Sequence, residues 1–150
     1  MMLAYRLVKL IEVHSEGLAN ALRERIERSD RCADYKNVPA DELTHVVHEM
    51  YRNLGEWLLG KTEADIERRY TAIGAKRAQQ NVPLSQVIWV IAEVKENLWE
   101  YLKRQDVLER PAEIFGELEM LQLLEQFFDR AMYYAALGYE RAAHPVGTHK

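Results

Sequence analysis

The chain has 150 residues, of which 48% are hydrophobic and 29% are charged, and its formal net charge is −4. This composition is typical of a globular domain with a sizeable core and excludes a disordered chain. The acidic balance argues against electrostatic binding to nucleic acid or to an anionic membrane, and no apolar run approaches the ~20 residues of a membrane span. The single cysteine, Cys32, excludes an internal disulfide and favours the reducing cytoplasm.

Hydrophobic periodicity predicts two helices in the first part of the chain, over residues 2–28 and 41–59. A polar connector, 29–40, separates them, and we expect Cys32 within it to be exposed and moderately reactive. Gly60 is expected to end the second helix, because glycine adopts the left-handed backbone conformation at little cost.

Three more helices are predicted by their start signals. Thr62 and Asp65 have the spacing of a capping box, while Pro83 and Pro111 stand where a helix can begin without the missing N–H group. The last helix is expected to end near Arg141, before a frayed tail over 143–150. Since no strand, repeat or linker is indicated, we expect one all-α domain over residues 1–150, a helical bundle of about five main helices.

The last predicted helix is apolar around much of its circumference. Besides one regular apolar face, it carries a second set of apolar side chains: Met120, Leu123, Phe127 and Tyr134. A helix with two apolar sides must bury both of them. One side can pack within the domain, and the second set then predicts an interface with another copy of the chain. The alternative is that this helix lies at the centre of its own domain.

Four ionisable side chains lie in the middle of apolar helix faces at a helical repeat of about 100° per residue. They are His14, Arg77, Lys95 and Glu125. In one interpretation they are structural, with Glu125 pairing with Arg77 or Lys95 and His14 hydrogen bonded within the core. In the other, His14, Arg77 and Lys95 converge on a small pocket that binds an anion or a polar signal molecule. A buried charge is costly without a partner, so either arrangement must supply one.

Tests for metal, haem and catalytic motifs give little support to those functions. His45 and His48 could lie on adjacent turns, but both fall on the polar side of their helix and lack a third ligand, so we expect no metal site. Only His14 is expected to face an apolar interior, as a haem ligand must, so haem is a weakly supported alternative and no cofactor is expected. No phosphate loop or nucleophile motif occurs, and hence we expect no catalytic residues and no enzyme.

Part of the sequence resembles a known family. The resemblance lies in Ile73-Gly74 with Arg77-Ala78, in the stretch from Val82-Pro83-Leu84 to Val87, and in Trp99 followed by Tyr101-Leu102. These residues are similar to the N-terminal domain of the RsbRD type, which forms the first part of stressosome co-antagonist proteins. The resemblance implies a globin-like helical domain, usually without haem, that dimerises and passes a signal through its last helix.

We therefore predict a non-enzymatic bacterial signalling domain that forms a homodimer and acts through its last helix on a partner or output domain. The alternative prediction is a globin-like protein that binds haem or a small ligand near His14.

Overall fold

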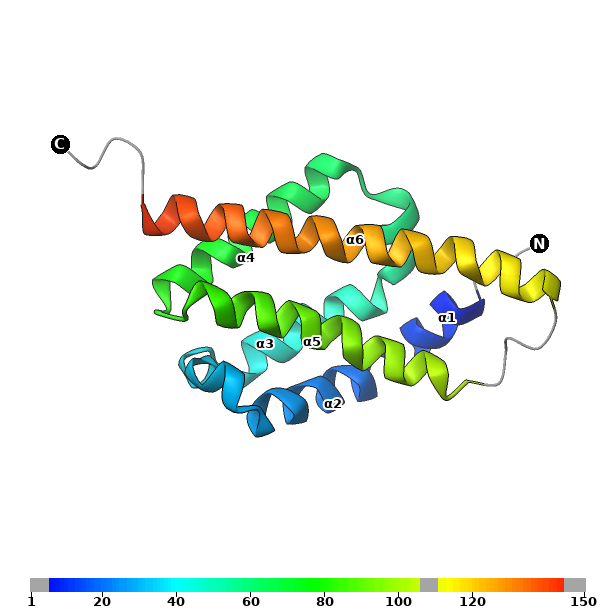
Figure 1. Ribbon diagram of the computed structural model, residues 1–150, viewed down its shortest axis with the longest axis horizontal. Helices are drawn as coiled ribbons and strands as arrows, with labels where there is room; N and C mark the ends of the chain where they lie inside the picture. Colours follow the sequence, from blue (N-terminus) through cyan, green and yellow to red (C-terminus); the bar gives the residue numbers. More distant parts are fainter. Residues whose placement is uncertain (1–5, 106–110, 145–150) are drawn as a thin grey trace.

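The computed structural model describes residues 6–105 and 111–144, with residues 111–117 described by their backbone alone. Every regular element in this part of the chain is helical, which confirms the predicted all-α fold (Figure 1). None of its helices is long and apolar enough to cross a membrane. The α-helices are α1 (Arg6–Val13), α2 (Ser15–Arg28), α3 (Ala40–Arg52), α4 (Glu63–Gln79), α5 (Leu84–Lys103) and α6 (Pro111–Ala143). Two short elements join them, a 3-10 helix η2 (Asp30–Asn37) and a π-helical turn η3 (Glu56–Gly60).

The first predicted helix is interrupted at His14, which separates α1 from α2. The His14 backbone departs from helical geometry, with φ −98° and ψ 19°. Its ring nitrogen Nδ1 lies 3.0 Å from the Leu10 carbonyl oxygen and 2.7 Å from the Tyr101 hydroxyl oxygen. His14 Nδ1 thus lies within hydrogen-bond distance of both its own preceding turn and α5, while the His14 side chain remains exposed.

The predicted polar connector is folded rather than open. It forms η2, which buries Cys32 and Tyr35 in the core. The expectation of an exposed, reactive Cys32 is therefore wrong, and burial also raises the pKa of its thiol. Of these two residues, Tyr35 also lines the apolar cavity within the bundle.

The second predicted helix ends earlier than its pattern suggested. Regular α3 stops at Arg52, since the Asn53 side chain donates to the Glu49 carbonyl oxygen and the Gly55 N–H donates to Glu12 in α1. Gly60 ends η3 without a left-handed φ. Among described non-glycine residues the left-handed conformation occurs at Asn81, with φ 62°.

The predicted starts of α4, α5 and α6 are confirmed. Thr62 accepts from the Asp65 N–H at 3.2 Å while Asp65 accepts from the Thr62 N–H at 2.9 Å, which completes the capping box of α4. Pro83 occupies the N-cap position directly before α5, and α6 begins at Pro111.

Helix α6 extends along the long axis of the molecule, with α4 and α5 beside it (Figure 1). Its contact with α4 is backbone to backbone at two glycines. A Cβ atom added at Gly74 would collide with the carbonyl group of Ala135, and one at Gly138 would collide with the backbone of Thr71. Small residues at these positions allow the two helices to approach this closely.

Candidate functional site

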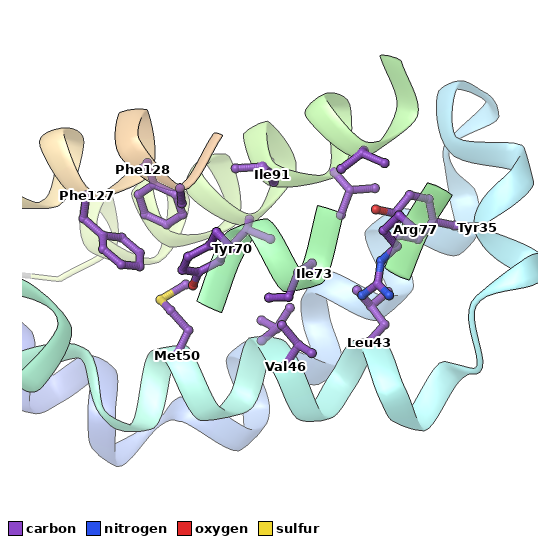
Figure 2. A pocket seen from close by; sticks show the side chains of 15 residues that line it. Tyr35, Leu43, Val46, Met50, Tyr70, Ile73, Arg77, Ile91, Phe127 and Phe128 are labelled. Carbon is purple, nitrogen blue, oxygen red and sulfur yellow. The ribbon is translucent and has the colours of Figure 1, made fainter. Parts of the chain in front are cut away.

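A small cavity lies at the centre of the bundle, between α3, α4, α5 and α6. Its volume is about 60 Å³ and its wall is almost entirely apolar. Figure 2 shows Phe127, Phe128 and Tyr70 near one end and Arg77 beside Tyr35 near the other. The lining residues are Tyr35, Leu43, Val46, Val47, Met50, Tyr70, Ile73, Arg77, Val87, Val90, Ile91, Val94, Phe127, Phe128 and Ala131.

Arg77 is the charged residue in this wall. It is 2% exposed, although it carries a charged guanidinium group. Its Nη1 donates to Glu42 Oε2 at 2.6 Å and to Gln80 Oε1 at 3.0 Å, and its guanidinium carbon lies 5.9 Å from the centre of the Tyr35 ring. The position is therefore that of a buried cation with one carboxylate partner at the edge of an apolar cavity.

The partner, Glu42, comes from the first turn of α3 and interacts with three side chains. Besides Arg77, Gln80 Nε2 donates to both of its carboxylate oxygens at 3.2 Å, and Lys76 Nζ lies 3.6 Å from Oε1. Burial by itself raises the pKa of Glu42, but the hydrogen bonds from Arg77 and Gln80 and the nearby charges bring it below its usual range. Glu42 is therefore held as a carboxylate.

An open groove between α3 and α4 reaches the same place from outside. Val46, Ile73 and Arg77 line both the groove and the cavity, so they form the wall between the two. The remaining groove residues are Pro39, Asp41, Glu42, His45, Arg69, Ala72 and Lys76. The ion pair between Arg77 and Glu42 thus stands at the boundary between solvent and the interior.

The four ionisable residues selected from the sequence do not form one site. Arg77 lines the cavity, whereas His14, Lys95 and Glu125 are absent from its wall. Lys95 Nζ lies 3.1 Å from Glu125 Oε1, and the Trp99 indole N–H donates to Glu125 Oε2 at 2.8 Å. Glu125 therefore pairs with Lys95, as one interpretation allowed, and Arg77 pairs with Glu42 instead.

The inward position predicted for His14 is wrong. The imidazole is exposed and hydrogen bonded to Tyr101, because the break between α1 and α2 leaves it at the rim of the bundle. This placement removes the basis for a haem ligand at His14. The cavity wall itself contains neither histidine nor cysteine. No group of three potential metal ligands occurs among the described residues, and His45 lies exposed in the outer groove.

The second apolar face predicted for the last helix is largely used within the chain. Met120 and Phe127 are buried in the domain's own core, so their prediction as free interface residues is wrong. Leu123 and Tyr134 are half-buried, and the Tyr134 hydroxyl donates to Glu63 in α4 at 2.6 Å. For Met120 and Phe127 the structure agrees with the alternative that the last helix lies within its own domain, because α4, α5 and η3 pack against α6.

Sequence reasoning identified Arg77 but missed the groups that hold it. Gln80 follows Arg77 at helical spacing, so the sequence contained a signal for that contact. Glu42 and Tyr35 carry no such signal, because they come from elements distant in the chain.

Comparison with known families tests the family resemblance that residues 73–102 suggest. Residues 16–148 match the family described as the RsbT co-antagonist protein rsbRD N-terminal domain. The chain belongs to this family. No curated protein and no solved structure matches it significantly. Membership of the rsbRD N-terminal domain family places the chain among signalling domains, and the match includes both Arg77 and Glu42.

Proposed function

We propose that this rsbRD-type domain is a non-enzymatic sensor in which a change at the central cavity alters the position of α6, and that α6 passes the change to a partner or output domain. The observation that carries the proposal is the double role of α6. It supplies Phe127, Phe128 and Ala131 to the cavity wall and also runs the length of the molecule (Figure 1). A change in the cavity can therefore reach a distant surface through one rigid element.

The contact between α4 and α6 supports this transmission. Gly74 and Gly138 bring the two backbones so close that a Cβ atom at either position would collide with the opposite helix, and we therefore expect the helices not to slide past each other. By contrast, α4 faces α3 through side chains, with ion pairs from Arg77 to Glu42 and from Arg69 to Glu49. We therefore expect α4 and α6 to shift together relative to α3.

Xenon provides a direct test, because it binds in apolar protein cavities without making polar contacts. We expect xenon to shift the NMR resonances of Val90 and Val94 methyl groups in the cavity wall. We also expect shifts in the α6 backbone amides of residues 136–143, which lie outside that wall. Shifts confined to the wall would contradict transmission through α6.

A matched pair of variants gives the control. Ala131→Val places two extra carbons at the buried α6 wall and should abolish the xenon response. Ala21→Val makes the same change on the exposed side of α2 and should leave the response intact. A response that survives Ala131→Val would mean that xenon acts from another place.

We also propose that the chain forms a homodimer through the outer side of α6. Fewer apolar residues of α6 are exposed than the sequence suggested. The support for the dimer is two large side chains that remain exposed on that helix, Leu118 at 52% and Tyr133 at 61%. Light scattering after size exclusion should show a dimer whose dissociation constant rises at least about tenfold with Tyr133→Lys. Leu59→Lys, at an exposed position in η3, should leave it unchanged. A monomer at high concentration would rule the dimer out.

A further inference from the structure

The Arg77 end of the cavity already has the form of a carboxylate-binding site. Arg77 and Gln80 direct hydrogen-bond donors at a single carboxylate, which at present belongs to Glu42. On one side of these donors lies the apolar cavity, and on the other lies the open groove. A molecule with a carboxylate at one end and an apolar tail at the other would match both features.

We propose that this site binds a small aliphatic monocarboxylate, whose carboxylate replaces that of Glu42 on Arg77 while its tail enters the cavity. The proposal rests on the sensor function proposed above and names the class of ligand. Glu42 is then an internal occupant that the ligand displaces.

Charge balance favours a monocarboxylate over other anions. Arg77 is almost completely buried, so removal of its partner without a replacement would leave an uncompensated charge. One carboxylate replacing another keeps the buried charge unchanged. A phosphate would bring more charge than Arg77 balances, and a neutral ligand that displaced Glu42 would leave Arg77 unpaired.

The displaced Glu42 has a place to go. Lys76 Nζ lies 3.6 Å from Glu42 Oε1, and the Lys76 side chain is largely exposed in the groove. Rotation of Glu42 into the groove would keep it paired with Lys76 in contact with water. The exchange therefore releases Arg77 without burying or isolating a second charge.

The cavity volume limits the tail. About 60 Å³ is roughly two fifths of the ~150 Å³ apolar cavity that accommodates benzene. A tail of about two to four carbons would fit in this volume, and a longer tail would have to push apart the side chains that line the cavity. That wall includes Phe127, Phe128 and Ala131, so the tail would touch the α6 residues on which the proposed signal depends.

Binding can be measured by titrating the intact chain with sodium butyrate and following NMR shifts of cavity methyl groups. Saturable shifts are expected with butyrate. Butyramide, which has nearly the same shape but no charge, should bind at least about tenfold more weakly, because hydrogen bonds to ionised groups are stronger. Acetate and octanoate should both bind less well than butyrate. Equal binding of butyrate and butyramide would overturn the proposal.

Glu42→Gln supplies the deciding variant. If Glu42 competes with the ligand, its removal should tighten butyrate binding by several fold, whereas damage to a merely structural ion pair would weaken it. Arg77→Met should abolish binding. If Arg77→Met does not fold, the sign of the Glu42→Gln effect still decides the question. Weaker binding to Glu42→Gln than to the natural chain would contradict displacement.

The two proposals fail in different ways. A chain whose α6 amides respond to xenon but which does not bind butyrate has the proposed transmission and not this ligand class. A chain that binds butyrate with the expected response to Glu42→Gln, but whose residues 136–143 do not shift, has the ligand site without the transmission.

Discussion

Helix α4 meets its two neighbours in opposite ways. Toward α6 it presents Gly74 and Thr71, and the two backbones touch. Toward α3 it presents Arg69 and Arg77, whose long side chains reach Glu49 and Glu42. The cavity also lies on this second side, lined in part by Ile73 and Val46.

The contact between α4 and α6 is therefore expected to be fixed, and the contact between α4 and α3 to be adjustable. Backbone contact has a single geometry, since no rotamer change can relieve a collision with a carbonyl group. Ion pairs between long side chains can exchange partners by rotation, as Glu42 could between Arg77 and Lys76. The bundle is thus expected to change at α3 while α4 and α6 keep their relative position.

Gly74→Ala should have the largest effect on stability. The added methyl group would meet the Ala135 carbonyl, so the helices must separate, and we expect the free energy of unfolding to fall by about 3 kcal/mol or more. Urea denaturation measures this directly. Gly17→Ala is the control, because a Cβ atom there meets nothing within 4 Å and should stabilise α2 by about 0.5–1 kcal/mol. Similar results for both variants would mean that the contact is not fixed.

Glu42→Gln should have the next largest effect. It leaves the buried Arg77 cation without a carboxylate, although glutamine still offers an oxygen acceptor and the site borders the groove. We expect a loss of about 2 kcal/mol in the free energy of unfolding, below the range for a fully buried pair. Glu24→Gln, at an exposed position in α2, should change stability by less than about 0.5 kcal/mol. A loss equal to that of Gly74→Ala would contradict the view of the α3 side as the adjustable one.

How far the sequence predicts these contacts depends on how local each one is. The Thr62–Asp65 capping box was predicted because all its atoms lie within one turn. The inward position of Arg77 was predicted because the helix phase fixes it. Its partner was not, because Glu42 is 35 residues away and only the packing of α3 on α4 selects it over Glu125.

Two failures have a different cause. The inward position of His14 assumed an unbroken helix, whereas the backbone departs from helical geometry at His14, so that Ser15 is buried in its place and His14 is exposed. Met120 and Phe127 were placed on an outer face because the sequence gives no measure of how many neighbours cover a helix. In the structure α4, α5 and η3 cover α6, and both apolar faces are largely used within the chain.

The Glu42 contribution should depend on pH in a defined direction. Its pKa is lower in the folded chain, so its stabilising effect is complete above the unfolded value and is lost as the pH falls through the folded value. The difference in unfolding free energy between the natural chain and Glu42→Gln should be constant above about pH 5 and shrink below about pH 4. Urea denaturation across this range tests the prediction. A difference that grows as the pH falls would mean that Glu42 is not held as a carboxylate.

Lys95→Met should have the smallest effect, although Lys95 and Arg77 occupy similar positions in their helix patterns. Lys95 and Glu125 remain 24% and 39% exposed, so water screens their interaction. After the substitution Glu125 keeps its hydrogen bond from Trp99, and methionine retains most of the apolar stem of lysine. We expect a loss of less than about 0.5 kcal/mol in urea denaturation, against about 2 kcal/mol for Glu42→Gln. Equal losses would mean that the two ion pairs contribute similarly to the free energy of unfolding. The burial of Arg77 would then not distinguish its ion pair from that of Lys95.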